Sequence, residues 1–470
     1  MENTKILKLF GYQSLDTISK LGLNFIASIF FARIFGPDII GQYAIIFFYY
    51  ALFITIGESG ISQIAIKAND VGKRYYLDLF KILSTIFISI TSLFILYIGF
   101  VEYDFVNILY TIPLISFFEI FSAIPKIKLY RELNYKTLFK CTIISEITSG
   151  ITTVILYCTG VVTSGLYLMM LYLLIKQLIS FLSLYLFNNF KSFLRNIEKK
   201  YSQKVDVKSS FKILFMSILD SIYRNMYSLI LTQKGYDNRN IGIYSRVDNL
   251  GKLSTSLLAT VVQKVTLPIF SKLDYKSEIY GSLFKVCLKF FSLLSVYISC
   301  SLMLFSYFIV IILYGDEFYE VGSYIKPVLF MTVLFPINAI LINEYILSSK
   351  FNELYVSEFT RKAIGLILMF YAAHISLYIF SWTIGVWGVV STFINIYLLG
   401  DRLDHTRSAI YLTSIKSLIF LILTYIVSIT IKDISFLVLY FFCITTYFVI
   451  ELLKINESFR KISYQFLKYW

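Results

Sequence analysis

Long runs of apolar residues, separated by short polar stretches, recur from one end of the chain to the other. Apolar and polar residues do not alternate within these runs as they would in the strands of a membrane barrel. Each run is long enough for a helix to cross the hydrocarbon core, and a helix satisfies its own backbone groups in lipid. We therefore predict fourteen membrane-spanning helices, at residues 12–33, 41–64, 77–99, 106–127, 139–158, 163–187, 211–233, 243–268, 284–313, 325–347, 357–378, 382–400, 411–430 and 434–453.

Composition supports this prediction and narrows the class of protein. Of the 470 residues, 57% are hydrophobic and 18% aromatic, which excludes a soluble domain and indicates an all-α, multi-pass membrane protein. The formal net charge is +14, but most of the basic residues lie between the apolar runs. Membrane topology therefore accounts for the positive charge, and no nucleic-acid partner is expected.

Lysine and arginine are distributed very unevenly between the two sets of loops. One set, which includes both termini, holds more than 20 of them, whereas the opposite set holds three, Lys234, Arg239 and Lys432. Positively charged loops stay in the cytoplasm, so we predict that both termini are cytoplasmic and that the number of spans is even.

A long basic connection divides the predicted spans near the middle of the chain. We predict a six-helix N-terminal lobe at 1–190, a cytoplasmic basic linker at 191–210, a six-helix C-terminal lobe at 211–400, and two further helices with a cytoplasmic tail at 401–470. No other loop is long enough to fold as a domain, so the function is expected to lie within the membrane.

Two of the predicted spans carry an acid and a base one helical turn apart. Asp16 and Lys20 lie in the first span, and Asp220 and Arg224 lie in the seventh. A charge at the bilayer centre costs about 2.5–3.5 kcal/mol on insertion scales, so such residues usually face a cavity or a partner. Two interpretations stay open, namely a neutralised structural pair and a cation that is available to a ligand.

The same two regions align as an internal repeat. Asp16 matches Asp220 and Lys20 matches Arg224, and after a short outer turn Gly41-Gln42-Tyr43 matches Gly242-Ile243-Tyr244. The intervals differ by three residues, which a loop can absorb. Two repeats in the same orientation predict a pseudo-two-fold axis along the membrane normal, as in transporters that rock around a site between two lobes.

Three blocks of sequence resemble a known family. They are 32–37 (ARIFGP) with 41–44 (GQYA) and 56–61 (IGESGI), then 129–135 (LYRELNY), and finally 241–246 (IGIYSR) through 267–271 (LPIFS). With these blocks the chain resembles the Wzx-type polysaccharide and O-antigen flippases of the multidrug/oligosaccharidyl-lipid/polysaccharide exporter superfamily.

The resemblance implies a function for the charged spans. Such proteins move undecaprenyl-diphosphate-linked oligosaccharide units across the bacterial inner membrane, for O-antigen of lipopolysaccharide, capsule or similar polymers, by alternating access around a cationic cavity. A polysaccharide polymerase and a chain-length regulator are the protein partners that the resemblance implies. The sugar and the coupling ion do not follow from it.

Lysine and arginine are the side chains suited to a diphosphate, as a point charge and as a bidentate fork. The bases that we predict to bind it are Lys20, Arg224, Arg246 and Lys252. The acids that could pair with them or take a coupling ion are Asp16, Glu58, Asp220 and Asp248.

Other functions are less consistent with the sequence. A multidrug antiporter of the same superfamily favours an acidic cavity and typically twelve spans. A polysaccharide polymerase generally needs a sizeable outer loop, and none of the predicted outer loops exceeds about a dozen residues. The chain has no nucleophile–base motif or glycine-rich phosphate loop, and its cysteines and two histidines do not cluster. We therefore expect a transporter without a metal or cofactor, and not an enzyme.

Overall fold

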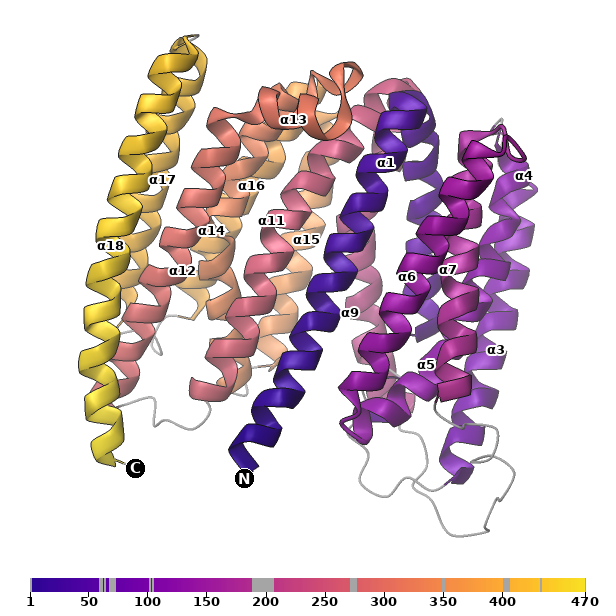
Figure 1. Ribbon diagram of the computed structural model, residues 1–470, viewed down its shortest axis with the longest axis horizontal. Helices are drawn as coiled ribbons and strands as arrows, with labels where there is room; N and C mark the ends of the chain where they lie inside the picture. Colours follow the sequence, from indigo (N-terminus) through magenta and orange to yellow (C-terminus); the bar gives the residue numbers. More distant parts are fainter. Residues whose placement is uncertain are drawn as a thin grey trace. The chain divides into compact units, whose positions relative to one another are not determined.

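The computed structural model describes residues 2–58, 62, 65–66, 73–100, 103, 105–187, 207–270, 277–348, 351–399, 406–431 and 433–469. These residues form helices and connecting turns, with no β-strand among them. Their contacts divide the chain into two compact units, residues 1–242 and 243–470. In each unit the long helices run side by side (Figure 1).

Unit 1 is built on a long first helix that the chain bends back on itself. Its elements are α1 (Glu2–Glu58), α3 (Lys73–Ile98), α4 (Val106–Leu109), α5 (Thr111–Arg131), α6 (Tyr135–Cys158), α7 (Gly165–Phe187), α9 (Val207–Asn225), α10 (Tyr227–Gln233) and the first turn of α11 (Asn238–Phe270). Within this unit α1 packs against α5, α6, α7 and α9, and α7 packs against both α5 and α6.

The bend in α1 lies at Gly36, directly before Pro37. Gly36 has φ 68° and ψ 178°, a combination that residues with a Cβ rarely adopt. The helix is therefore two helical halves joined by a sharp turn, and these halves coincide with the first two predicted spans. Helix α1 thus contains two predicted membrane crossings.

Unit 2 contains the remainder of α11 and the helices that follow it. They are α12 (Glu278–Leu304), α13 (Ser306–Tyr314), the short 3₁₀ helix η1 (Asp316–Phe318), α14 (Val321–Leu347), α15 (Phe351–Ala372), α16 (Leu377–Leu398), α17 (Arg407–Thr430) and α18 (Ile434–Tyr469). The most enclosed of the membrane-capable helices is α14, which packs against α12, α16 and α17.

Small residues bring α16 close to α14. A Cβ built on Gly385 would lie 2.1 Å from the backbone oxygen of Pro327, and one on Gly388 would lie 2.2 Å from Met331 Cγ. Packing between membrane helices relies on such small residues, because lipid supplies no hydrophobic force to join them. The two glycines therefore explain why α14 and α16 form the tightest pair of unit 2.

Ten of the described helical elements are long and apolar enough to cross a membrane, so the chain is a multi-pass membrane protein. Each of the fourteen predicted spans overlaps a described helix. Three of those helices, α9, α11 and α15, are not among the ten. The count of fourteen crossings and the cytoplasmic position of the termini stay predictions, as does the lobe boundary at the linker, most of which lies outside the described residues.

Candidate functional site

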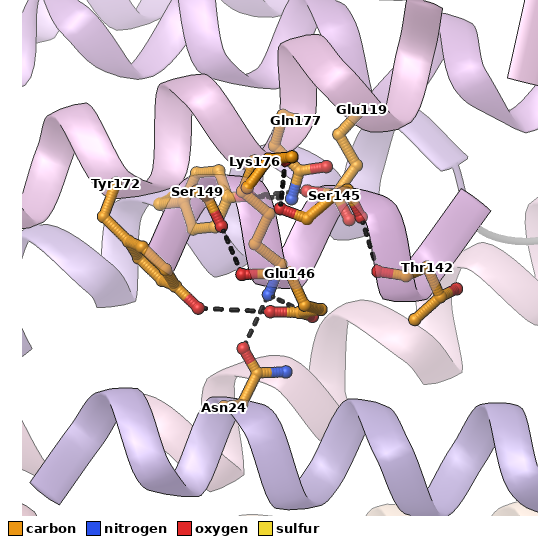
Figure 2. A network of polar contacts seen from close by, with 11 residues as sticks. Asn24, Glu119, Thr142, Ser145, Glu146, Ser149, Tyr172, Lys176 and Gln177 are labelled. Atoms are coloured by element: carbon orange, nitrogen blue, oxygen red, sulfur yellow. Dashed lines mark hydrogen bonds and ion pairs between the residues drawn. The ribbon is translucent and has the colours of Figure 1, made fainter. Parts of the chain in front are cut away.

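A network of polar contacts in unit 1 is carried by α6 and α7 (Figure 2). The start of α6 is fixed by Asn134, whose side chain accepts a hydrogen bond from the backbone N–H of Thr137 at 3.3 Å. Capping of this kind satisfies an amide that the helix leaves without a partner. Three turns further along α6, Glu146 faces Tyr172 and Lys176 of α7, the neighbouring helix in the bundle.

Glu146 and Lys176 form an ion pair inside the unit. Lys176 Nζ lies 2.7 Å from Glu146 Oε1, and the two side chains are 1% and 12% exposed for the acid and the base. The Tyr172 hydroxyl donates to Glu146 Oε2 at 3.1 Å, and Lys176 Nζ also donates to Asn24 Oδ1 of α1 at 2.6 Å. The pair thus joins three helices and neutralises both buried charges.

A second part of the network connects α1, α5 and α7. The Tyr50 hydroxyl donates to Glu119 Oε2 at 2.5 Å, and Gln177 Nε2 donates to the Tyr50 hydroxyl at 3.1 Å. Tyr50 and Gln177 are both buried. The acid of α5 is therefore held by a tyrosine, whereas the acid of α6 is held by a lysine.

Asp16 and Lys20 do not form an ion pair, although they lie one turn apart on α1. Lys20 is exposed, and its electrostatic neighbours are Lys126, Asp16, Glu119 and Lys176. Asp16 Oδ1 is buried and has no hydrogen-bond partner among the described residues. The described residues therefore show no neutralised Asp16–Lys20 pair, and a cation that is available to a ligand stays a prediction for Lys20.

The equivalent pair on α9 is formed. Arg224 Nε lies 2.8 Å from Asp220 Oδ2, and the side chains are 60% exposed for the base and 38% for the acid. The helix packs against α1 within unit 1. The pair is accessible, so an anion could approach Arg224 without unfolding the helix.

The remaining predicted residue of unit 1, Glu58, is the last residue of α1, and its side chain lies outside the described part of the chain.

In unit 2 the two predicted bases of α11 lie in different surroundings. Lys252 Nζ lies 2.5 Å from Asp248 Oδ2, with 36% of the lysine side chain exposed. Arg246 is only 3% exposed; its guanidinium lies 5.7 Å from the centre of the Tyr314 ring, and its Nη2 donates to Ser245 Oγ at 3.3 Å. Lys252 is therefore accessible in this structure, whereas Arg246 is enclosed within its own unit.

The sequence indicated which helices carry charged residues, but it did not predict the ion pair between Glu146 and Lys176. Lys176 has no acid one turn away on its own helix, so the i, i+4 rule gave it no partner. Glu146 and Lys176 lie in consecutive predicted spans, and comparing their depths in the bilayer could have suggested the pair. No group of three or more histidine, cysteine or acidic side chains suited to a metal occurs among the described residues.

Comparison with solved structures shows which fold this arrangement belongs to. The chain is similar to the lipid II flippase MurJ in an inward closed conformation, with a TM-score of 0.67, 16% sequence identity, and coverage of 97% of this chain and 98% of that one. It is also similar to an outward-facing multidrug resistance MATE transporter of the MOP superfamily, with a TM-score of 0.51, 12% identity, and coverage of 87% and 92%. At these identities the likeness establishes the fold.

Sequence comparison identifies the family. A search of curated proteins gave no match. A family model described as polysaccharide biosynthesis protein matches residues 30–323, which is more than half of the chain. The matched region extends from α1 through α13 to the start of α14, and it includes all the predicted diphosphate-binding bases except Lys20. The family resemblance seen in the sequence is thus confirmed, and the chain belongs to the polysaccharide biosynthesis protein family.

Proposed function

We propose that this protein is a flippase that moves undecaprenyl-diphosphate-linked oligosaccharide units across the inner membrane of a bacterium, for O-antigen, capsule or a related polysaccharide. Its membership of a polysaccharide biosynthesis family and its MurJ-like fold over nearly the whole chain support this assignment. The transport step is alternating access, in which the headgroup crosses the bilayer and the lipid tail stays in it.

The observation that carries the proposal is the presence of accessible bases on membrane helices. Lys20 is exposed without an ion pair on α1, and Arg224 and Lys252 are partly exposed on α9 and α11. A diphosphate needs such groups, because its charge is costly to bring into a medium of low dielectric constant without counter-charges. A carrier for cationic drugs would need the opposite sign of charge.

The acids explain how the bases can remain in the membrane when no substrate is bound. Asp220 and Asp248 each lie within 2.8 Å of their base, so Arg224 and Lys252 each have a counter-charge before the substrate arrives. We infer that phosphate oxygens displace these carboxylates from Arg224 within unit 1 and from Lys252 within unit 2, and that Lys20 of unit 1 needs no such exchange because it has no ion pair to break.

Deletion of the gene with analysis of membrane lipids tests the function. We expect unpolymerised lipid-linked oligosaccharide to accumulate on the inner leaflet and the surface polymer to disappear. Sensitivity to cationic drugs with normal polymer would instead identify a multidrug antiporter. Loss of polymer with repeat units already on the outer leaflet would indicate a polymerase.

Single alanine variants test the residues. Lys20→Ala, Arg224→Ala and Lys252→Ala are each expected to reduce surface polymer at least tenfold while the amount of protein in the membrane is unchanged, because one charge-assisted contact to a phosphate accounts for about a tenfold change. Lys416→Ala, which removes an exposed charge from α17, is the matched control. Normal polymer in all three variants would refute the cationic site.

A further inference from the structure

A buried lysine near the start of α14 takes no part in the proposed transport site. Lys326 is 6% exposed, and its ammonium group donates to the backbone oxygen of Ser428 on α17 at 3.1 Å. The same group lies 5.0 Å from the centre of the Tyr307 ring of α13. Among the described residues no carboxylate forms an ion pair with it. An ammonium group has three N–H donors, so this buried cation has donors to spare and no counter-charge.

Lys326 lies near the start of α14, at the end of unit 2 that carries α13 (Figure 1). Tyrosine side chains of several helices lie at this end. Tyr307 stacks on Tyr319 with ring centres 4.7 Å apart, and the hydroxyls of Tyr378 and Tyr425 lie 2.8 Å from each other. Tyr319 and Tyr378 are 53% and 40% exposed. Neutral hydroxyl donors beside a buried cation are suited to the oxygens of a phosphate group.

An apolar groove adjoins the tyrosines. It has a volume of about 390 Å³ and is lined by Leu368 of α15 and by Trp382, Val386 and Val390 of α16. Trp382 belongs to both features, since its ring lies 5.3 Å from that of Tyr425. Because α16 is one of the helices apolar enough to span a membrane, a hydrocarbon chain is the occupant that suits the apolar lining of the groove.

We propose that Lys326, the tyrosines and the groove form one binding site for a lipid with an anionic phosphate headgroup. The phosphate binds the Lys326 ammonium and the tyrosine hydroxyls, and one acyl chain lies in the groove beside Trp382. The positive charge of Lys326 favours an anionic headgroup. Trp382 adjoins both the tyrosines and the groove, so an acyl chain in the groove lies next to the headgroup. This lipid is bound by unit 2 alone and does not depend on the proposed transport function.

An ordinary belt of interfacial aromatic residues makes a different prediction. Tyrosine and tryptophan anchor many membrane proteins at the headgroup level irrespective of the charge of the lipid. A site built on Lys326 must instead prefer an anionic headgroup, and that preference must disappear with the charge of this one residue.

Native mass spectrometry of the full-length protein tests the headgroup. The protein is titrated with phosphatidylglycerol and, separately, with phosphatidylcholine of the same chains. We expect one retained phosphatidylglycerol with about a tenfold preference over phosphatidylcholine, because the choline ammonium offsets the charge of the phosphate that both lipids carry. The preference should be lost in Lys326→Met and kept in Lys326→Arg and in Lys416→Met. An unchanged preference in Lys326→Met would overturn the proposal.

A second variant tests the chain and avoids the buried core. Val386 is 51% exposed in the groove, so Val386→Trp should fill the groove without disturbing the fold. We expect this variant to bind long-chain phosphatidylglycerol several-fold more weakly and a short-chain form as the wild type does. Equal loss for both forms would show that the chain does not lie in the groove. Displacement of the lipid by inorganic phosphate at equal concentration would show that the ligand is free phosphate, and would overturn the lipid assignment.

Discussion

Gly41 of α1 packs against α11, and Gly242 of α11 packs against α1. A Cβ built on Gly41 would lie 1.8 Å from the backbone oxygen of Asn238, and a Cβ built on Gly242 would lie 1.8 Å from that of Pro37. Each glycine thus meets the residue four positions before the other. These are the two glycines that align in the internal repeat, so the contact has the symmetry that the repeat predicts.

A side chain at Gly41 or Gly242 should destabilise the protein, because the backbones of α1 and α11 lie close together there. Gly41→Ala and Gly242→Ala are each expected to lower the stability of the protein by about 1–3 kcal/mol, because a methyl group would have to displace backbone and not a flexible side chain. Thermal unfolding in detergent measures the effect. Gly150→Ala is the control, since nothing lies within 4 Å of the added methyl group and α6 continues on both sides of it. An equal change in all three variants would contradict this prediction.

The parts of the fold that depend on local sequence could be predicted, and the reason is physical. A span needs only enough consecutive apolar residues, so the predicted spans coincide with helices. The pairs Asp220–Arg224 and Asp248–Lys252 follow from the pitch of a helix, which brings residues four apart together. Asp16 and Lys20 have the same spacing without the contact, which shows that spacing permits a pair and does not enforce it.

Contacts between helices could not be predicted in this way. The Glu146–Lys176 pair depends on how α6 and α7 are rotated against each other, and Arg246 is enclosed because its helix packs toward Tyr314. Hydrophobic patterns are weak guides to rotation here, because lipid-facing and buried faces of a membrane helix are both apolar. The sequence therefore located the charges in the bilayer but did not determine their partners.

The bend at Gly36 provides a second test of the backbone. Gly36→Ala places a Cβ at φ 68° and ψ 178°, a region that is essentially limited to glycine and costs of order 1–3 kcal/mol for other residues. We expect a lower unfolding temperature in Gly36→Ala and no loss in Gly22→Ala, where the same change adds a methyl group to open space in the same helix. Equal stability of the two variants would show that α1 can make this turn without a glycine.

Removing one partner of the buried Glu146–Lys176 pair should destabilise the protein more than removing both charges. Glu146→Gln leaves Lys176 without its counter-charge, which is expected to cost about 3–5 kcal/mol, and Glu146→Gln with Lys176→Met should recover part of that loss. A double-mutant cycle on unfolding free energies measures the coupling. The pair Lys128–Glu132 on α5, at 3.8 Å with the acid 50% exposed, serves as the comparison and should couple by less than about 1 kcal/mol. Additive effects at positions 146 and 176 would contradict the ion pair.

The two bases of α11 should respond differently to the same substitution. Arg246 is enclosed and packs over Tyr314, so Arg246→Ala should lower the unfolding free energy by about 2 kcal/mol or more through lost packing and a lost cation–π contact. Lys252 is 36% exposed and pairs with Asp248 on the same helix, so Lys252→Ala should change the unfolding free energy by less than about 1 kcal/mol.

Measuring stability and polymer export on the same variants separates structural from transport roles on α11. Lys252→Ala should reduce export per folded molecule. Arg246→Ala should reduce the amount of folded protein, and export should fall in proportion to it. If export per folded molecule also falls in Arg246→Ala, the arginine must leave Tyr314 during the cycle and meet the substrate. That result would place both bases of α11 in the diphosphate site, and the enclosed position of Arg246 would then represent one state of transport.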